Sequence, residues 1–280
     1  MASKRRPTDN ERDDAVNTRR DVLVAAISFL ILMAALPGVV SAQGGSATPG
    51  SGISGSAHDF TGAGVLSAPS TAVGLCTYCH TPHKALSTLL LWNHTLSKNS
   101  FAWDVPSTTA GTPFAKFTVD TYQGPTAKCL SCHDGSVAIG DIAWFAEASH
   151  TGGDALDSTK HDSGEFNIGL GGNLAKNHPV AMPYPFNNVG STYNSSKTGG
   201  AIVLNEWQAD PTKISNIRLF NDSNGLGTIT AGPVVGKTGI ECSSCHDPHN
   251  KAAVDDLFLR GKLTGSAQGS GYICVQCHVK

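Results

Sequence analysis

All eight cysteines of this 280-residue chain belong to four copies of one short pattern, Cys-x-x-Cys-His. The cysteine pairs are Cys76 and Cys79, Cys129 and Cys132, Cys242 and Cys245, and Cys274 and Cys277, followed by His80, His133, His246 and His278. This spacing is the attachment signature of c-type haem. The two thiols bond the vinyl groups of one porphyrin, and the histidine becomes the proximal ligand of the iron. The sequence therefore predicts four haem c groups.

Zinc knuckles, redox dithiols and disulfides are the alternative uses of eight cysteines. None of these needs a histidine directly after the second cysteine of every pair. Histidine accounts for 11 of the 280 residues. Four such neighbours by chance have a probability of about 2 in a million. The alternatives leave the histidines unexplained, so covalent haem is the favoured interpretation.

Residues 1–42 have the layout of a signal peptide. A polar segment with six Lys or Arg, 1–21, precedes an uncharged and mostly apolar run, 22–40. Small residues at 40–42 (Val-Ser-Ala) form an acceptable cleavage site. The alternative is an uncleaved membrane anchor, because the run approaches the ~20 residues that span a bilayer; Pro-Gly at 37–38 favours cleavage. The arginines at 19–20 resemble a twin-arginine signal, which exports folded proteins. Haem attachment needs an unfolded chain outside the cytoplasm, which favours the route that exports unfolded chains.

Cleavage after residue 42 leaves 238 residues, which fit one or two domains by length. Segment 43–57 is rich in Gly, Ser and Ala and predicts a flexible leader. A tetrahaem domain, 58–280, follows, with haems 1 and 2 in 58–200 and haems 3 and 4 in 201–280. The mature chain keeps 14 basic and 17 acidic residues, and haem propionates add negative charge. We therefore expect neither a nucleic-acid-binding face nor a membrane span in the mature form.

Regular structure is expected to be scarce, since Gly, Pro, Ser, Thr and Asn interrupt almost every apolar run. We predict short helices after the haem motifs, over 81–91 and also over 141–149. A small β-hairpin is predicted within 213–230, with Asn-Gly at 224–225 as its turn. A further short strand is predicted at 201–204. The expected fold class is a multihaem cytochrome c, mostly irregular coil packed around a chain of four haems that supplies the missing core.

The second axial ligand decides whether an iron only transfers electrons or also binds a small molecule. Met182 is the only methionine of the mature chain, so at most one iron has a His/Met pair. Seven histidines lie outside the motifs: His58, His83, His94, His150, His161, His178 and His249. We expect His150 and His161 to be solvated, because their loop is rich in Gly, Asp and Ser. Enough histidines remain for bis-histidine ligation and low potentials throughout.

Five histidines are the candidate distal ligands. His83 and His249 each follow a proline that stands three residues after the second cysteine of a motif, which turns the imidazole toward a neighbouring haem. His94 lies on the apolar segment Leu-Trp-Asn-His, which could back a porphyrin. His178 is stiffened by the proline that follows it, and His58 comes directly after the Gly/Ser-rich leader.

These segments also carry a family resemblance. Ala-His-Asp-Phe, the Cys-x-x-Cys-His-Thr-Pro-His and Cys-x-x-Cys-His-Asp-Pro-His repeats, Leu-Trp-Asn-His and Asn-His-Pro-Val resemble the tetrahaem cytochromes with doubled haem motifs. More narrowly, the chain resembles the outer-surface cytochromes of metal-respiring bacteria that polymerise into conductive filaments. The resemblance covers about residues 56–280. It implies bis-histidine haems in a continuous stacked chain, and one histidine that ligates a haem of the adjacent subunit, here His58 on its leader.

The resemblance implies an electron-transfer protein and not an enzyme. As a head-to-tail homopolymer at the cell surface, it would take electrons from upstream cytochromes and deliver them to extracellular acceptors. A soluble periplasmic tetrahaem carrier is the alternative, with all four irons satisfied inside one chain. A multihaem reductase of nitrite or hydroxylamine would need an open iron. Such enzymes often mark that iron with Cys-x-x-Cys-Lys, which this sequence lacks.

Overall fold

The computed structural model describes residues 48–61, 74–87, 89–103, 116–145, 148–150, 167–195 and 204–279. All of these ranges belong to the compact unit Gly44–Lys280. The predictions for the signal peptide, for His161 and for most of the strand at 201–204 lie outside the described residues. Within the described ranges, no helix combines the length and the apolarity needed to cross a bilayer.

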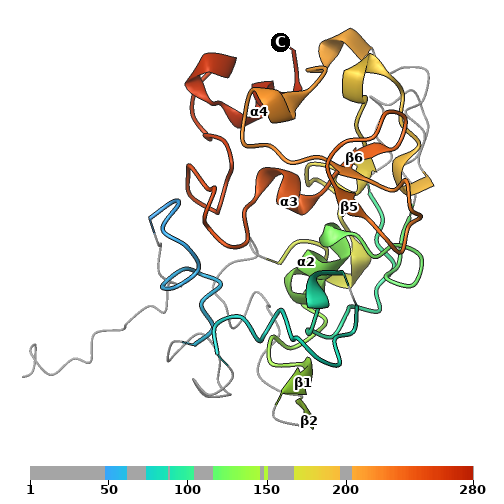
Figure 1. Cartoon of the computed structure of the whole chain (residues 1–280), viewed down its shortest axis with the longest axis vertical. Coiled ribbons are helices and arrows are strands. Elements are labelled where there is room, and N and C mark those ends of the chain that lie inside the picture. The colour runs from blue at the N-terminus through green and yellow to red at the C-terminus, as the bar shows by residue number, and fades with distance from the viewer. Residues whose placement is uncertain are drawn as a thin grey trace, which may run out of the picture. The chain divides into compact units, whose positions relative to one another are not determined.

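Turns, bends and short elements make up most of the described chain (Figure 1). Three α-helices occur in it: α2 (Pro125–His133), α3 (Cys242–Cys245) and α4 (Ile273–Cys277). Each of them contains the two cysteines of one haem motif, so the prediction that helices follow the motifs is wrong for these three. The 3-10 turns are η1 (Leu89–Leu91), η2 (Leu170–Gly172), η3 (Phe186–Asn188), η4 (Tyr193–Ser195), η5 (Leu204–Glu206), η6 (Pro211–Lys213) and η7 (Gln268–Ser270).

The strands form two small antiparallel sheets. Their bounds are β1 (Ile142–Phe145), β2 (Ala148–His150), β3 (Met182–Pro183), β4 (Phe220–Asn221), β5 (Thr230–Ala231) and β6 (Thr238–Ile240). One sheet pairs β1 with β2, and the other has the order β3-β6-β4-β5. Because β4 pairs with β5 across the Asn-Gly turn, the predicted hairpin is confirmed, with shorter strands than expected. Of the predicted strand 201–204, only the last residue, Leu204, is described, and it begins a 3-10 turn.

Two predicted helices are not found. In the described part of 81–91, the backbone bends and ends in a single 3-10 turn. Lys84, Leu90 and Leu91 have positive φ values there, which an α-helix does not allow. Over 141–149 the chain instead forms β1 and β2. Isoleucine, tryptophan and phenylalanine in β1 favour extended backbone.

Several small groups of buried side chains take the place of one large core. The largest comprises Phe101, Phe117, Tyr122, Ala127, Leu130, Leu174, Ala181, Tyr193, Phe220 and Ile229. The second contains Tyr78, Ile139 and Ile142, and the third contains Met182, Tyr184, Leu219 and Ile240. Leu130 lies between the cysteines of α2, Cys79 packs on the second group and Cys277 on the third. The apolar side chains are therefore gathered beside the haem motifs.

Candidate haem sites

A single helical turn brings the three reactive groups of each motif together. The amide of His80 donates to the carbonyl oxygen of Cys76 at 2.9 Å, and His246 and His278 make the equivalent bonds at 3.0 Å. The second motif lies within α2. Positions i, i+3 and i+4 share one face of a helix, so two thiols and an imidazole project to the same side. All eight cysteines have free thiols, and none forms a disulfide.

Two proximal histidines are oriented by the same backbone contact. The ring Nδ1 of His80 lies 2.6 Å from the carbonyl oxygen of Leu90, and that of His246 lies 2.7 Å from the carbonyl oxygen of Leu257. Since a carbonyl can only accept, Nδ1 carries the proton and Nε2 keeps a lone pair for a metal. Both leucines have positive φ values, 62° and 56°. The internal repeat thus extends to two residues that sequence patterns did not single out.

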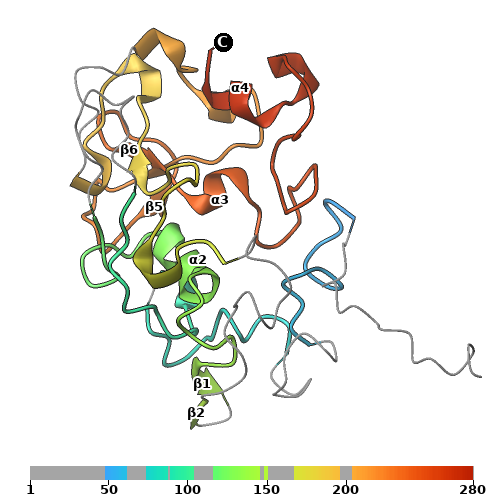
Figure 2. The same cartoon turned by 180° about the vertical axis from the view of Figure 1, so that it is seen from behind.

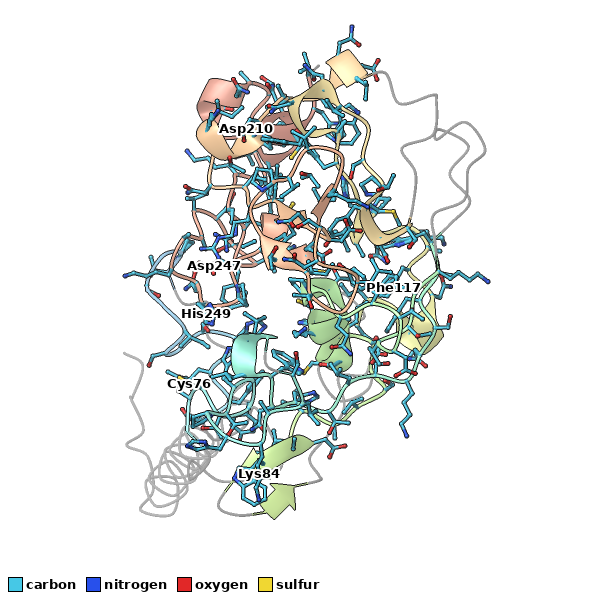
Figure 3. The ribbon with its side chains drawn as sticks, turned by 45° about the vertical axis from the view of Figure 1, so that its right-hand side comes forward. Cys76, Lys84, Phe117, Asp210, Asp247 and His249 are labelled. Carbon is cyan, nitrogen blue, oxygen red and sulfur yellow. The ribbon has the colours of Figure 1, made fainter. Side chains whose placement is uncertain are left out.

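Three of the four proximal histidines lie next to a predicted distal ligand. The ring centroids are 6.0 Å apart for His80 and His249, 6.2 Å for His133 and His58, and 6.4 Å for His278 and His178. The first pair is nearly parallel, with 22° between the ring planes. Figure 3 labels His249 close to the segment that begins at Cys76. The structure therefore places three of the five candidate distal histidines beside motif histidines from distant parts of the sequence.

The spacing of these rings leaves room for one iron between the two members of each pair. If an iron were held by both rings, each ligating nitrogen would lie about 2.0 Å from it, and the centroid separations of 6.0, 6.2 and 6.4 Å are compatible with that. No group of three or more His, Cys, Asp or Glu among the described residues is arranged to hold a metal ion. A haem iron takes only two ligands from the protein, so the pairs fit haem.

His58 is held inside its own chain. Its Nδ1 lies 3.0 Å from the carbonyl oxygen of Pro248, and its ring lies 4.8 Å from that of Phe258. Burial, followed by repulsion from His133, lowers the pKa of His58 to about 4. The imidazole is therefore neutral near pH 7, the form in which histidine binds a metal. This placement differs from the sequence expectation that His58 reaches into an adjacent subunit.

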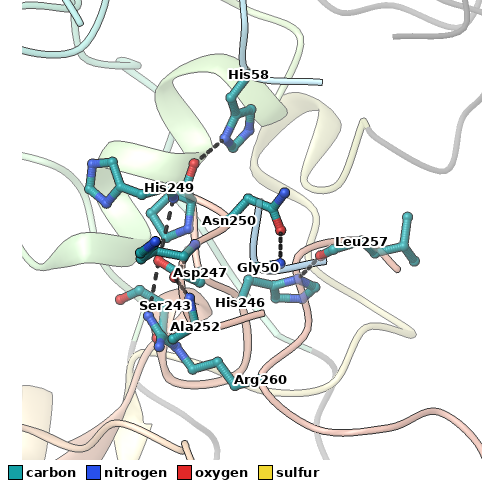
Figure 4. A network of polar contacts seen from close by, with 12 residues as sticks. Gly50, His58, Ser243, His246, Asp247, His249, Asn250, Ala252, Leu257 and Arg260 are labelled. Carbon is teal, nitrogen blue, oxygen red and sulfur yellow. Dashed lines mark hydrogen bonds and ion pairs between the residues drawn. The ribbon is translucent and has the colours of Figure 1, made fainter. Parts of the chain in front are cut away.

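A buried ion pair fixes the loop that carries His249 (Figure 4). The Asp247 carboxylate accepts hydrogen bonds from the backbone amides of Lys251 and Ala252, at 2.8 and 2.5 Å. It also lies 3.3 Å from Nη2 of Arg260, whose Nε donates to the carbonyl oxygen of Ser243. Burial opposes ionisation, but the amides and the guanidinium hold the pKa of Asp247 below its ordinary value. These contacts fix the loop that leads from motif 3 to His249.

The remaining candidates behave differently. His94 is only 1% exposed, and its two nitrogens lie 2.8 Å from the carbonyl oxygen of Thr95 and 3.1 Å from that of Ala138. Its Nε2 is also 3.5 Å from the sulfur of Cys132. His83 is exposed, in the turn after motif 1. No histidine of the described residues pairs with His246 at the spacing of the other three pairs.

Cysteines of consecutive motifs lie close enough to influence one another electrostatically. The pairs are Cys79 with Cys132, Cys129 with Cys242, and Cys245 with both Cys274 and Cys277. Burial raises the pKa of Cys277 to about 12, and neighbouring Cys245 adds to the effect. Figures 1 and 2 both show α3 between α2 and α4. Motifs 1 to 4 thus follow one another in space in the order of the sequence, which favours a continuous chain of porphyrins.

Comparison with known proteins finds no family model and no curated protein that matches this chain.

Proposed function

We propose that this chain is a tetrahaem electron-transfer protein whose copies join head to tail into an extracellular conducting filament. The observation that carries the electron-transfer part is the set of three histidine pairs at 6.0 to 6.4 Å. When bound, haem iron gains and loses single electrons, and two imidazole ligands leave it no open position for a substrate. Upstream cytochromes are the proposed donors, and the acceptors lie outside the cell.

The chain's own residues have three tasks in this proposal. The cysteines fix each porphyrin, and the paired histidines hold its iron from both sides. The carbonyl oxygens of Leu90 and Leu257 orient the rings of His80 and His246 and make them stronger ligands. The contacts between consecutive motifs keep neighbouring porphyrins close, so that electrons pass along the chain.

The filament part of the proposal rests on His246 and His83. His246 has its Nδ1 bound to a carbonyl, which leaves its Nε2 for an iron, but no described histidine stands opposite it. His83 is exposed and lies outside the three pairs. We therefore assign the bridging role to His83 of an adjacent copy instead of His58, which lies against His133 of its own chain. One exposed donor and one incomplete site make a directional contact that repeats into an open filament.

A soluble periplasmic carrier is the second candidate, and buried His94 favours it. His94 lies beside Cys132 inside the chain, and a modest rotation of its ring would free Nε2 for an iron of the same chain. In that case all four irons would be six-coordinate in a monomer. The two candidates therefore differ in whether the fourth distal histidine comes from the same chain or from an adjacent copy.

The test compares His83→Ala with His94→Ala in exported, haem-loaded protein. The filament proposal predicts that His83→Ala gives monomers with one high-spin haem, and that His94→Ala still polymerises with every haem low-spin. Electron microscopy and electron paramagnetic resonance measure the two properties. A His83→Ala variant that still polymerises with four low-spin haems would overturn the bridge. A monomeric wild type with four low-spin haems would favour the carrier, and an open iron in the assembled wild type would favour a reductase.

A further inference from the structure

The N-terminal segment of the described chain is fastened to the motif 3 loop at Asn250, whose backbone carbonyl oxygen accepts from the Gly52 amide at 3.0 Å and whose side chain makes the other contacts (Figure 4). The Asn250 Nδ2 donates to the carbonyl oxygens of Thr48 and Gly52, both at 3.1 Å, and contacts the Ser51 hydroxyl at 3.3 Å. Its Oδ1 accepts from the amide of Gly50 at 3.2 Å. Asn250 is 1% exposed and has a φ of 50°. Its amide is thus committed to this segment.

A short run of turns connects this contact to His58. The Ser56 amide donates to the carbonyl oxygen of Ile53, and the Asp59 amide donates to that of Ser56, both at 3.0 Å. The Ser56 hydroxyl accepts from the amide of His58 at 3.2 Å. Pro248, two residues before Asn250, provides the carbonyl oxygen that receives the ring Nδ1 of His58. One loop therefore holds both the segment and its histidine.

The composition of the segment makes Asn250 important. Residues 50–56 read Gly-Ser-Gly-Ile-Ser-Gly-Ser, so a single apolar side chain is available for packing. Its three glycines lose much conformational freedom on ordering, and hydrogen bonds must offset that loss. The segment therefore needs a specific polar partner to become ordered, which differs from the flexible leader expected over 43–57.

We propose that Asn250 is a positioning residue for His58. By fastening residues 48–52, it sets the His58 imidazole opposite His133, and loss of the fastening leaves that iron open to an external ligand such as carbon monoxide. The inference rests on the proposed function, since it takes His58 to be an axial ligand. Asn250 itself would contact no iron. Its role would be to hold the N-terminal segment in place, so that His58 completes one haem site.

Asn250→Gly is the sharpest test, because glycine tolerates the left-handed backbone and removes the amide. We expect one high-spin haem per chain, binding of one carbon monoxide per chain after reduction, and return to low spin when imidazole is added. His58→Ala should give the same spectrum, and the double variant should add nothing, because both changes remove one ligand. Asn224→Gly, on an exposed turn, is the matched control and should stay low-spin.

The outcomes separate this inference from the function on which it rests. If His58→Ala opens one haem and Asn250→Gly opens none, the positioning role is wrong and the ligand assignment stands. If His58→Ala leaves every haem low-spin, His58 is not an axial ligand, and the positioning role of Asn250 is wrong as well. The proposal that the chain carries four haems would still stand, because haem content is measured separately. Should Asn250→Gly fail to fold, hydrogen exchange on the wild type decides: a Gly50 amide, the donor to the Asn250 Oδ1, that exchanges as fast as free peptide would overturn the fastening.

Discussion

The histidines differ in the hydrogen bonds that their ring nitrogens make. In His80 and His246, the ring Nδ1 donates to a leucine carbonyl, and in His178 it lies 2.9 Å from the carbonyl oxygen of Pro179. Each contact leaves Nε2 available for a metal. In His94, both nitrogens lie beside backbone carbonyl oxygens. The local hydrogen bonds thus distinguish ready ligands from a histidine that must first rotate.

His178 allows the clearest test of a single predicted iron ligand. We expect His178→Ala to leave the iron under His278 five-coordinate, because its ring lies 6.4 Å from that of His278. The visible spectrum should gain one high-spin haem per chain, and the reduction potential of that haem should rise. His150→Ala serves as the control and should leave the spectrum unchanged. Identical spectra for the two variants would remove His178 from the set of ligands.

Between elements, a buried carboxylate joins the helices of motifs 2 and 3. Glu241, with 0% exposure, caps α3 and accepts hydrogen bonds from the amide of Thr126 in α2 at 2.8 Å and from the hydroxyl of Tyr193 at 2.5 Å. Tyr122 donates to the same carboxylate oxygen as Tyr193. The buried Glu241 side chain therefore links α2 to α3, and this link keeps Cys129 beside Cys242.

Glu241 predicts how stability depends on pH. Burial raises the pKa of its carboxyl above the ordinary value, although the surrounding donors oppose this effect. Its contribution is therefore full below the ordinary pKa and is lost as the pH rises through the raised, folded-state pKa. We expect Glu241→Gln to remove this component of the pH dependence of the unfolding free energy, measured with denaturant from about pH 4 to about pH 8. If the unfolding free energies of the wild type and of Glu241→Gln changed with pH in the same way, Glu241 would not be the group responsible.

Sequence patterns predicted the parts of these elements that depend on local chemistry. The hairpin could be predicted because its Asn-Gly turn acts within a few residues. The helix predicted over 81–91 failed because leucine and lysine there adopt positive φ values, which their side chains disfavour. Asn250 and the Leu90 and Leu257 carbonyls could not be found, since their roles arise from contacts between segments or from backbone atoms.

For the whole molecule, the scarcity of regular structure is consistent with the proposal that haems complete the core. The buried apolar side chains form three small groups beside the motifs. We expect protein produced without haem attachment to unfold without a cooperative transition and to be cleaved rapidly by protease, because a ligand stabilises only the state that holds it. Circular dichroism melting of loaded and unloaded protein measures this. Equal, cooperative melts would show that the chain folds unaided.

We propose that all four Cys-x-x-Cys-His motifs carry haem. Intact-mass spectrometry of the exported protein under denaturing conditions tests this, since thioether-bound haem survives unfolding. We predict one species that starts after residue 42 and carries four haem masses, and replacing Cys242 and Cys245 with alanine should remove one of them. A mass equal to that of the polypeptide alone, or to one with zinc or disulfides in place of haem, would show that the motifs do not attach haem.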